Sequence, residues 1–170
     1  MLAFQEEPLI RTISEECKMC YTCVRECPAK AIRVRDGQAE VIYERCIGCG
    51  NCVRVCSQEA KEVLDNTEDV KRLLDDVQTR TAAIVAPSFP AEFTDCEAGD
   101  VVAMLRALGF DYVTEVAFGA DLVAAAYKRL LTTAQGKRYI ATTCPGIVAF
   151  VERFYPEMVP NLAPIVSPMV

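Results

Sequence analysis

One cysteine spacing occurs twice in this chain, and it constrains the fold more than any other feature of the sequence. The pattern C-x2-C-x2-C-x3-C is formed first by Cys17, Cys20, Cys23 and Cys27. It returns 29 residues further on as Cys46, Cys49, Cys52 and Cys56. A repeat of this kind indicates that one metal-binding unit has been duplicated.

The spacing predicts two [4Fe-4S] clusters. Three cysteines at these intervals wrap one face of an iron–sulfur cubane, and the fourth lies on a helix that carries it towards the other cluster. On this rule, one cluster is bound by Cys17, Cys20, Cys23 and Cys56. The other cluster is bound by Cys46, Cys49, Cys52 and Cys27. Pro28 follows the first set, whereas Ser57 follows the second, and neither position supplies a ligand.

Structural zinc and disulfide bonds are the alternative uses of eight cysteines. Zinc motifs usually pair two C-x2-C knuckles across a longer gap. The N-terminus lacks the basic and apolar regions of a secretory signal, so we expect a reducing cytoplasm in which metal ligation is favoured over disulfides. Because such clusters are oxygen-sensitive, we also expect an anaerobic setting. The chain contains no histidine, which excludes His-ligated zinc, His-ligated clusters and His-based catalytic triads.

The charge of the chain bears on its partners. The formal net charge is −6, and two thiolate-bound clusters would make it more negative. This disfavours nucleic acid and anionic membrane surfaces as partners. No apolar run approaches the roughly 18 residues of a membrane span. The partner that we expect is a redox protein, acting as electron donor or acceptor.

The sequence around the cysteines predicts a small α+β domain over residues 1–65. Residues 31–35 and 39–43 alternate apolar and polar side chains on either side of Asp36-Gly37, which indicates a β-hairpin. We expect an apolar shell around the clusters made of Ile10, Ile13, Ile32, Val34, Val41, Ile47, Val53 and Val55.

The rest of the chain predicts an α/β segment. Residues 66–80 fit a connector helix, and strands then alternate with helices over residues 81–170, which favours a parallel sheet. The expected strands are 81–86, 111–117 and 138–141. The expected helices contain residues 101–108, cover 119–133, and begin at Pro145 to end before Pro156.

Two features of the second half are candidates for chemistry. The first expected strand is followed by Ala86, Pro87 and Ser88, at a position where α/β folds usually bind ligands, although local sequence by itself favours a simple strand-ending turn. Cys144 directly precedes a helix-starting proline, where the helix dipole favours a thiolate, and the alternative is an ordinary buried cysteine. Cys96 lies in a polar stretch and is interpreted as a non-ligand.

Several segments carry a resemblance to known families. Residues 8–64 resemble the bacterial-type dicluster ferredoxins. Val85-Ala86-Pro87-Ser88, Leu108-Gly109-Phe110-Asp111 and Ala120-Asp121-Leu122 resemble successive segments of the [FeFe], or iron-only, hydrogenases. Thr142-Thr143-Cys144-Pro145-Gly146 resembles the first active-site signature of that family, T-S-C-C-P-x-W. The similarity continues through residues 151–157 and 167–169.

The resemblance implies an H-cluster, in which a third [4Fe-4S] cluster is bridged to a binuclear iron centre. Cys144 then matches a ligand of the third cluster, and Ala86, Pro87 and Ser88 match the loop beside the binuclear iron. Thr143 stands where the family has its proton-delivering cysteine, Ile147 replaces the tryptophan, and residues 122–143 contain no carboxylate. These departures fit the divergent, sensory branch of the family.

The functional expectation follows from the length of the match. The other ligand signatures of the third cluster would lie beyond Val170, so the chain resembles the N-terminal part of such a protein. We expect electron transfer through two clusters, with the H-cluster, H2 and protons involved only in a longer chain. The alternatives are a stand-alone ferredoxin-type carrier with a docking lobe and a hydrogen-sensing regulatory protein.

Overall fold

The computed structural model describes residues 9–134 and 136–170. The chain divides into two compact units. The first unit contains the described residues up to Asp65 together with Pro145–Val159, and the second contains Asn66–Cys144 and Pro160–Val170. Within the described residues, no helix combines the length and the apolar composition needed to cross a membrane.

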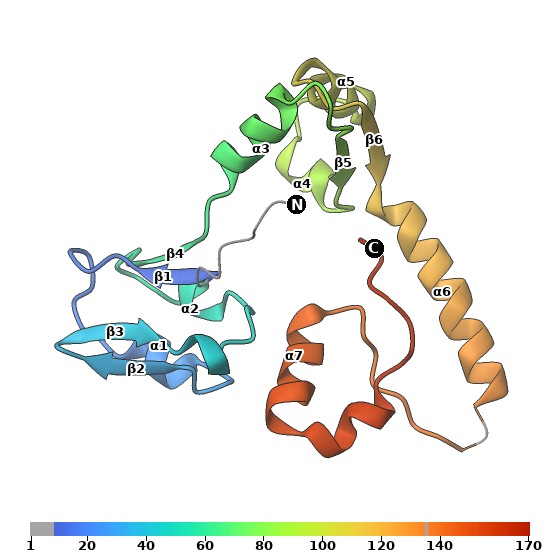
Figure 1. Cartoon of the computed structure of the whole chain (residues 1–170). Helices are drawn as coiled ribbons and strands as arrows, with labels where there is room; N and C mark the ends of the chain where they lie inside the picture. The colour runs from blue at the N-terminus through green and yellow to red at the C-terminus, as the bar shows by residue number, and fades with distance from the viewer. Residues whose placement is uncertain (1–8, 135) are drawn as a thin grey trace. The chain divides into compact units, whose positions relative to one another are not determined.

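Two antiparallel strand pairs organise the first unit (Figure 1). Strand β1 (Ile10–Thr12) pairs with β4 (Lys61–Val63), and β2 (Ile32–Arg35) pairs with β3 (Gln38–Val41). Asp36 and Gly37 join β2 to β3 with φ angles of 48° and 76°. Two consecutive positive φ angles are typical of a type I′ hairpin turn. The hairpin predicted around Asp36-Gly37 is therefore confirmed.

The helices of the first unit repeat with the cysteines. Helix α1 (Thr22–Glu26) carries Cys23, and α2 (Asn51–Arg54) carries Cys52. Each helix is preceded by a residue in the left-handed conformation, Tyr21 with φ 59° and Gly50 with φ 71°. These two residues are 29 positions apart, so the sequence repeat is also a repeat of backbone conformation. A short 3-10 helix, η1 (Tyr43–Arg45), precedes the second motif.

Helix α7 (Pro145–Phe154) also belongs to the first unit. Phe154 packs against the buried core that contains the cysteines. The guanidinium of Arg45 lies 5.4 Å from the centroid of the Phe154 ring, a geometry that favours cation–π attraction. The start of α7 at Pro145 agrees with the expected helix, and Pro156 opens the 3-10 helix η2 (Pro156–Asn161).

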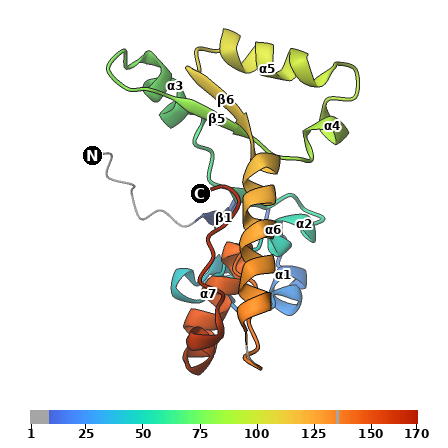
Figure 2. The ribbon, with the colours of Figure 1, turned by 90° about the vertical axis from the view of Figure 1, so that its right-hand side faces the viewer.

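The second unit contains a two-stranded parallel sheet. Strand β5 (Ala82–Val85) pairs with β6 (Tyr112–Glu115) in parallel register, from Ala82 opposite Tyr112 to Val85 opposite Glu115. The connection contains the short helix α4 (Phe89–Glu92) and α5 (Ala98–Ala107), which lies beside the strands in Figure 2. Helix α3 (Thr67–Asp75) precedes the sheet, and α6 (Val116–Thr133) follows it directly. The expected parallel α/β arrangement is confirmed.

Two expected strands differ from the structure. Residues 138–141 form no strand: Ile140 makes an isolated parallel bridge to Leu162. The backbone of Ile140 is paired with residues near that bridge, since its N–H donates to Asn161 at 2.8 Å and its carbonyl accepts from Ala163 at 2.9 Å. The expected strand 111–117 is also too long, because Val116 and Ala117 already belong to α6.

Candidate iron–sulfur centres

Two of the cavities in the first unit are each lined by four cysteines. The first cavity is lined by Cys17, Cys20, Cys23 and Cys56. The second is lined by Cys27, Cys46, Cys49 and Cys52. In each cavity, three cysteines come from one motif and the fourth comes from the other motif. This is the grouping that the spacing predicts, and the ligation itself remains a prediction.

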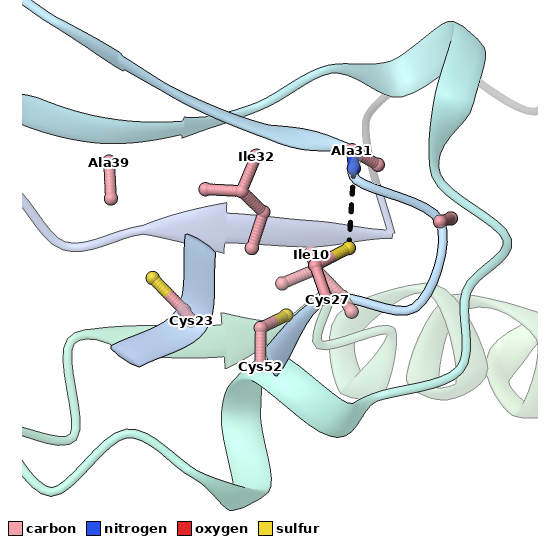
Figure 3. Packing of buried hydrophobic residues seen from close by; sticks show 8 residues of the cluster. Ile10, Cys23, Cys27, Ala31, Ile32, Ala39 and Cys52 are labelled. Atoms are coloured by element: carbon pink, nitrogen blue, oxygen red, sulfur yellow. Dashed lines mark hydrogen bonds between the residues drawn. The ribbon is translucent and has the colours of Figure 1, made fainter. Parts of the chain in front are cut away.

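Short helices place the cysteines at these cavities. Cys23 lies within α1 and Cys52 within α2, and both side chains are buried. Cys27 directly follows α1 and is buried as well, and it lines the second cavity whereas Cys23 lines the first. Figure 3 shows the sulfur atoms of Cys23, Cys27 and Cys52 among the apolar side chains of the core. The second cysteine of each motif, Cys20 or Cys49, is exposed.

Small and apolar residues surround the sulfur atoms. The buried members of this cluster other than cysteine are Ile10, Ala29, Ala31, Ile32 and Ala39. The backbone N–H of Ala31 donates to Cys27 Sγ at 3.2 Å, as drawn in Figure 3. Such a donor stabilises negative charge on sulfur. The expected apolar shell is therefore present at Ile10 and Ile32, and Val41, Ile47 and Val53 pack against it. Val34 lines the first cavity although it is 42% exposed.

The thiol pKa values follow from burial and neighbouring groups. Burial raises the pKa of Cys23 and of Cys52, and the Lys61 ammonium acts on both thiols in the opposite direction. The hydrogen bond with Thr22 lowers the pKa of the exposed Cys20 thiol. Because the thiolate is the form that binds metal, the Lys61 ammonium offsets part of the cost of burying negative charge at these two sulfur atoms.

Soft thiolates in an apolar pocket are the donor set that iron–sulfur clusters take. All ten cysteines lie in the described residues, and all are free thiols. In those same residues, no group of three or more Cys, Asp or Glu side chains converges on a point that would hold a single metal ion. A zinc site needs such convergence, whereas a cubane binds each thiolate through a different iron.

The candidate residues of the second unit lie on exposed loops. Ala86, Pro87 and Ser88 connect β5 to α4 and are exposed, and the Phe89 N–H donates to the Ala86 carbonyl at 3.1 Å. Cys144 immediately precedes α7 and is exposed, which does not match an ordinary buried cysteine. No hydrogen bond or ion pair in the described residues joins the 86–88 loop to Cys144. A role for either in metal binding remains a prediction.

Thr142 fixes the loop that leads to Cys144. Its N–H donates to the Tyr127 hydroxyl at 2.9 Å, and its own hydroxyl donates to the carbonyls of Ala163, at 3.1 Å, and Ile165. The loop is therefore anchored at Thr142 to α6 and to the C-terminal segment. The neighbouring Thr143 and Cys144 side chains are exposed.

Lys61 is the residue at the cysteine cavities that sequence reasoning missed. Its side chain is 5% exposed, and it lines the first cavity. The repeat contained the signal, because the 29-residue offset aligns Lys61 with Ile32, a buried apolar residue of the other cavity. A lysine in place of an isoleucine at a core position is a departure that the alignment of the two halves could have revealed.

Two known family models match this chain. The family model described as "4Fe-4S dicluster domain" matches residues 9–57, the part that holds both cysteine motifs. The family model described as "Iron only hydrogenase large subunit, C-terminal domain" matches residues 79–170, which is more than half of the chain. The chain belongs to the iron-only hydrogenase family. The resemblance inferred from the sequence is thus confirmed.

One curated protein with a similar segment is the cytosolic Fe-S cluster assembly factor NAR1 of Yarrowia lipolytica. It is 29% identical to this member of the family over 91 residues, which cover 54% of this chain. The matched region spans 18% of the length of the relative. The two proteins are therefore similar over one segment.

Proposed function

We propose that this chain transfers single electrons through two [4Fe-4S] clusters, as the ferredoxin-like part of a hydrogenase-like oxidoreductase. One cluster is bound by Cys17, Cys20, Cys23 and Cys56, and the other by Cys46, Cys49, Cys52 and Cys27. The observation that carries this proposal is the distribution of the eight cysteines over two cavities, four to each. Each bound cluster would supply a one-electron couple.

The residues around the cavities suit electron transfer. Access of water to the sulfur atoms is limited by Ile10, Ile32 and the buried alanines. The local dielectric constant around the sulfur atoms is therefore low. The exposed Cys20 and Cys49 place one edge of each cavity near the surface. Electrons can therefore be exchanged with a redox partner protein at these edges, without substrate having to enter the core.

We do not expect this chain by itself to catalyse hydrogen turnover. Thr143 carries a hydroxyl at the position where the hydrogenase resemblance implies a proton-delivering cysteine, and a hydroxyl is a poor acid or base near neutral pH. Cys144 stands alone as a candidate ligand on its loop, in the residues that the structure describes. An H-cluster would need further ligands from a longer chain.

A second candidate function is a role in iron–sulfur cluster assembly. The observation that favours it is the 29% identity to the NAR1 assembly factor over 91 residues. An electron carrier keeps its clusters, whereas an assembly protein passes iron and sulfide to an acceptor. The two functions are therefore separated by mixing the loaded protein with an apo-ferredoxin and following the acceptor's visible absorption.

The experiment that tests the main proposal is a count of iron and acid-labile sulfide on anaerobically purified protein. We expect about eight of each per chain, and two one-electron couples in a potentiometric titration followed by EPR. A count of about four would contradict the two-cluster assignment. A count of about twelve would mean that a third cluster forms, and hydrogen chemistry would then have to be tested directly.

A further inference from the structure

Lys61 is a buried cation in the centre of the first unit. Its side chain is 5% exposed and is the buried charged group of the ferredoxin-like core. Its Nζ donates to the carbonyl oxygen of Ala39 at 2.8 Å and to the hydroxyl of Thr12. Thr12 in turn donates to the same carbonyl, so strands β1, β3 and β4 meet at this ammonium.

The hydrogen bonds of Lys61 leave its charge without a counterion. Both acceptors are neutral oxygens, and no carboxylate in the described residues forms an ion pair with Lys61. The neighbouring Glu62 pairs instead with Arg11. An ammonium that is removed from water without a compensating negative charge is strongly unfavourable. A negative group is therefore expected close to Lys61 in the loaded protein.

The cysteine cavities supply that negative charge. Lys61 lines the first cavity together with Cys17, Cys20, Cys23 and Cys56. Its electrostatic effect reaches the thiols of Cys23, in the first cavity, and Cys52, in the second. A [4Fe-4S] cluster with four thiolates carries a net charge of about −2 when oxidised and about −3 when reduced. A nearby cation thus stabilises the reduced cluster more than the oxidised one.

The two cavities differ at this position. Lys61 begins β4 and Ile32 begins β2, each five residues after the fourth cysteine of its motif. Ile32 lines the second cavity at the place that Lys61 takes in the first. The duplicated unit therefore has a buried cation beside one cavity and an apolar side chain beside the other.

We propose that Lys61 is the buried counter-cation of the clusters, and that it makes the cluster held by Cys17, Cys20, Cys23 and Cys56 the more easily reduced of the two. The inference rests on the proposed two-cluster function. Lys61 acts only through its charge. One electron enters the cluster from a donor protein or from dithionite, and no bond to Lys61 forms or breaks. Electrons in the singly reduced protein then reside mainly on the first cluster.

The test is an EPR-monitored redox titration of the anaerobic, cluster-loaded full chain and its Lys61→Met variant. We expect the reduction equilibrium of the first cluster to fall by about tenfold, which is about 59 mV for a one-electron couple, and that of the second cluster to fall by less. The couples are assigned from the paramagnetically shifted β-protons of Cys23 and Cys52 in NMR spectra. If the variant retains about eight irons and the two reduction potentials change equally or not at all, the inference is overturned.

Lys18→Met is the matched control. Lys18 lines the same cavity, but it is exposed and its Nζ contacts the Glu15 carbonyl at 3.2 Å. Because water screens an exposed charge, we expect a change of less than about twofold in either reduction equilibrium. A shift in Lys18→Met as large as that in Lys61→Met would show that any nearby charge suffices, and would overturn a special role for the buried cation.

Ile32→Lys provides an independent test if Lys61→Met fails to retain iron. This variant places a second ammonium at the repeat-equivalent position of the second cavity, and we expect the second cluster to become easier to reduce. An unchanged second couple would overturn the inference. The iron and sulfide count separates failure of this inference from failure of the proposed function. If the variants contain about eight of each and their reduction potentials are unaltered, only the role of Lys61 is rejected. If the wild-type chain lacks two redox couples, the proposed function is rejected.

Discussion

The guanidinium of Arg153 donates a hydrogen bond to the backbone carbonyl oxygen of Cys46, a predicted cluster ligand 107 positions earlier in the chain. The same Nη1 lies 3.4 Å from the carbonyl oxygen of Tyr43. Together with Phe154, which packs on the cysteine core, this arginine holds α7 against the segment that begins the second motif. A helix within the hydrogenase-family match thereby belongs to the ferredoxin-like unit.

Arg153→Met is expected to loosen α7 from the first unit. A hydrogen bond that involves a charged group has a net value of about 1.5–3 kcal/mol. Because Arg153 is exposed, we expect the loss of stability to lie at or below the lower end of this range. Hydrogen–deuterium exchange of residues 145–154 should become faster. Arg129→Met on α6 serves as the control, since Arg129 forms no ion pair in the described residues. Equal exchange in the native protein and Arg153→Met would contradict the anchoring role.

If the fourth cysteine of each motif binds the cluster of the other motif, single cysteine variants should fall into two groups according to which cluster's EPR signal survives. We expect Cys27→Ala and Cys49→Ala to leave the same surviving EPR signal, because both residues line the second cavity. Cys56→Ala and Cys20→Ala should leave the other signal, because both line the first. Each variant should retain about four of the eight irons. Grouping by motif, with Cys27→Ala resembling Cys20→Ala, would show that the cysteines do not cross.

Gly119 lies within α6 where its Cα approaches the C-terminal segment. A Cβ added there would lie 2.2 Å from the carbonyl oxygen of Pro168, so Gly119→Ala must displace residues around Pro168. We expect a lower melting temperature and faster proteolysis after residue 160. Gly99→Ala in α5 is the control, because a Cβ at Gly99 meets no atom within 4 Å. In open space, alanine stabilises a helix by up to about 1 kcal/mol relative to glycine. Destabilisation by both substitutions alike would refute this explanation.

We expect the stability of the second unit to depend on pH through Asp111. The N–H of Thr81 donates to its carboxylate at 2.8 Å, and this bond lowers the pKa of Asp111. Since the folded pKa lies below the unfolded value of about 3.9, the stabilisation is present above that value and is lost as the pH falls through the folded pKa. Asp111→Asn should therefore lower the melting temperature near pH 7, and its difference from the native protein should shrink as the pH falls below about 4. A pH-independent difference would contradict the prediction.

Much of the first unit could be predicted from local sequence. The hairpin depends on Asp36 and Gly37, which adopt positive φ angles with little strain. The grouping of the cysteines depends on a three-residue step that moves the fourth cysteine out of its own loop. Both are short-range effects, and short-range effects are encoded in neighbouring residues.

The errors arose where long-range contacts decide the structure. Residues 138–141 have the composition of a strand, but the backbone of Ile140 pairs with Asn161 and Ala163 instead of with the sheet. Val116 and Ala117 are compatible with a strand or a helix, and α6 includes them. Local propensity does not distinguish these outcomes, because pairing partners far along the chain determine them.

Residue spacing is enough to predict two four-cysteine motifs whose fourth cysteines cross, followed by an α/β segment of the iron-only hydrogenase family. The packing of α7 on the ferredoxin-like core and the burial of the Lys61 ammonium beside the first cavity became evident only in three dimensions. Ligand spacing is set along the chain, whereas burial and counter-charge depend on which distant strands and helices meet.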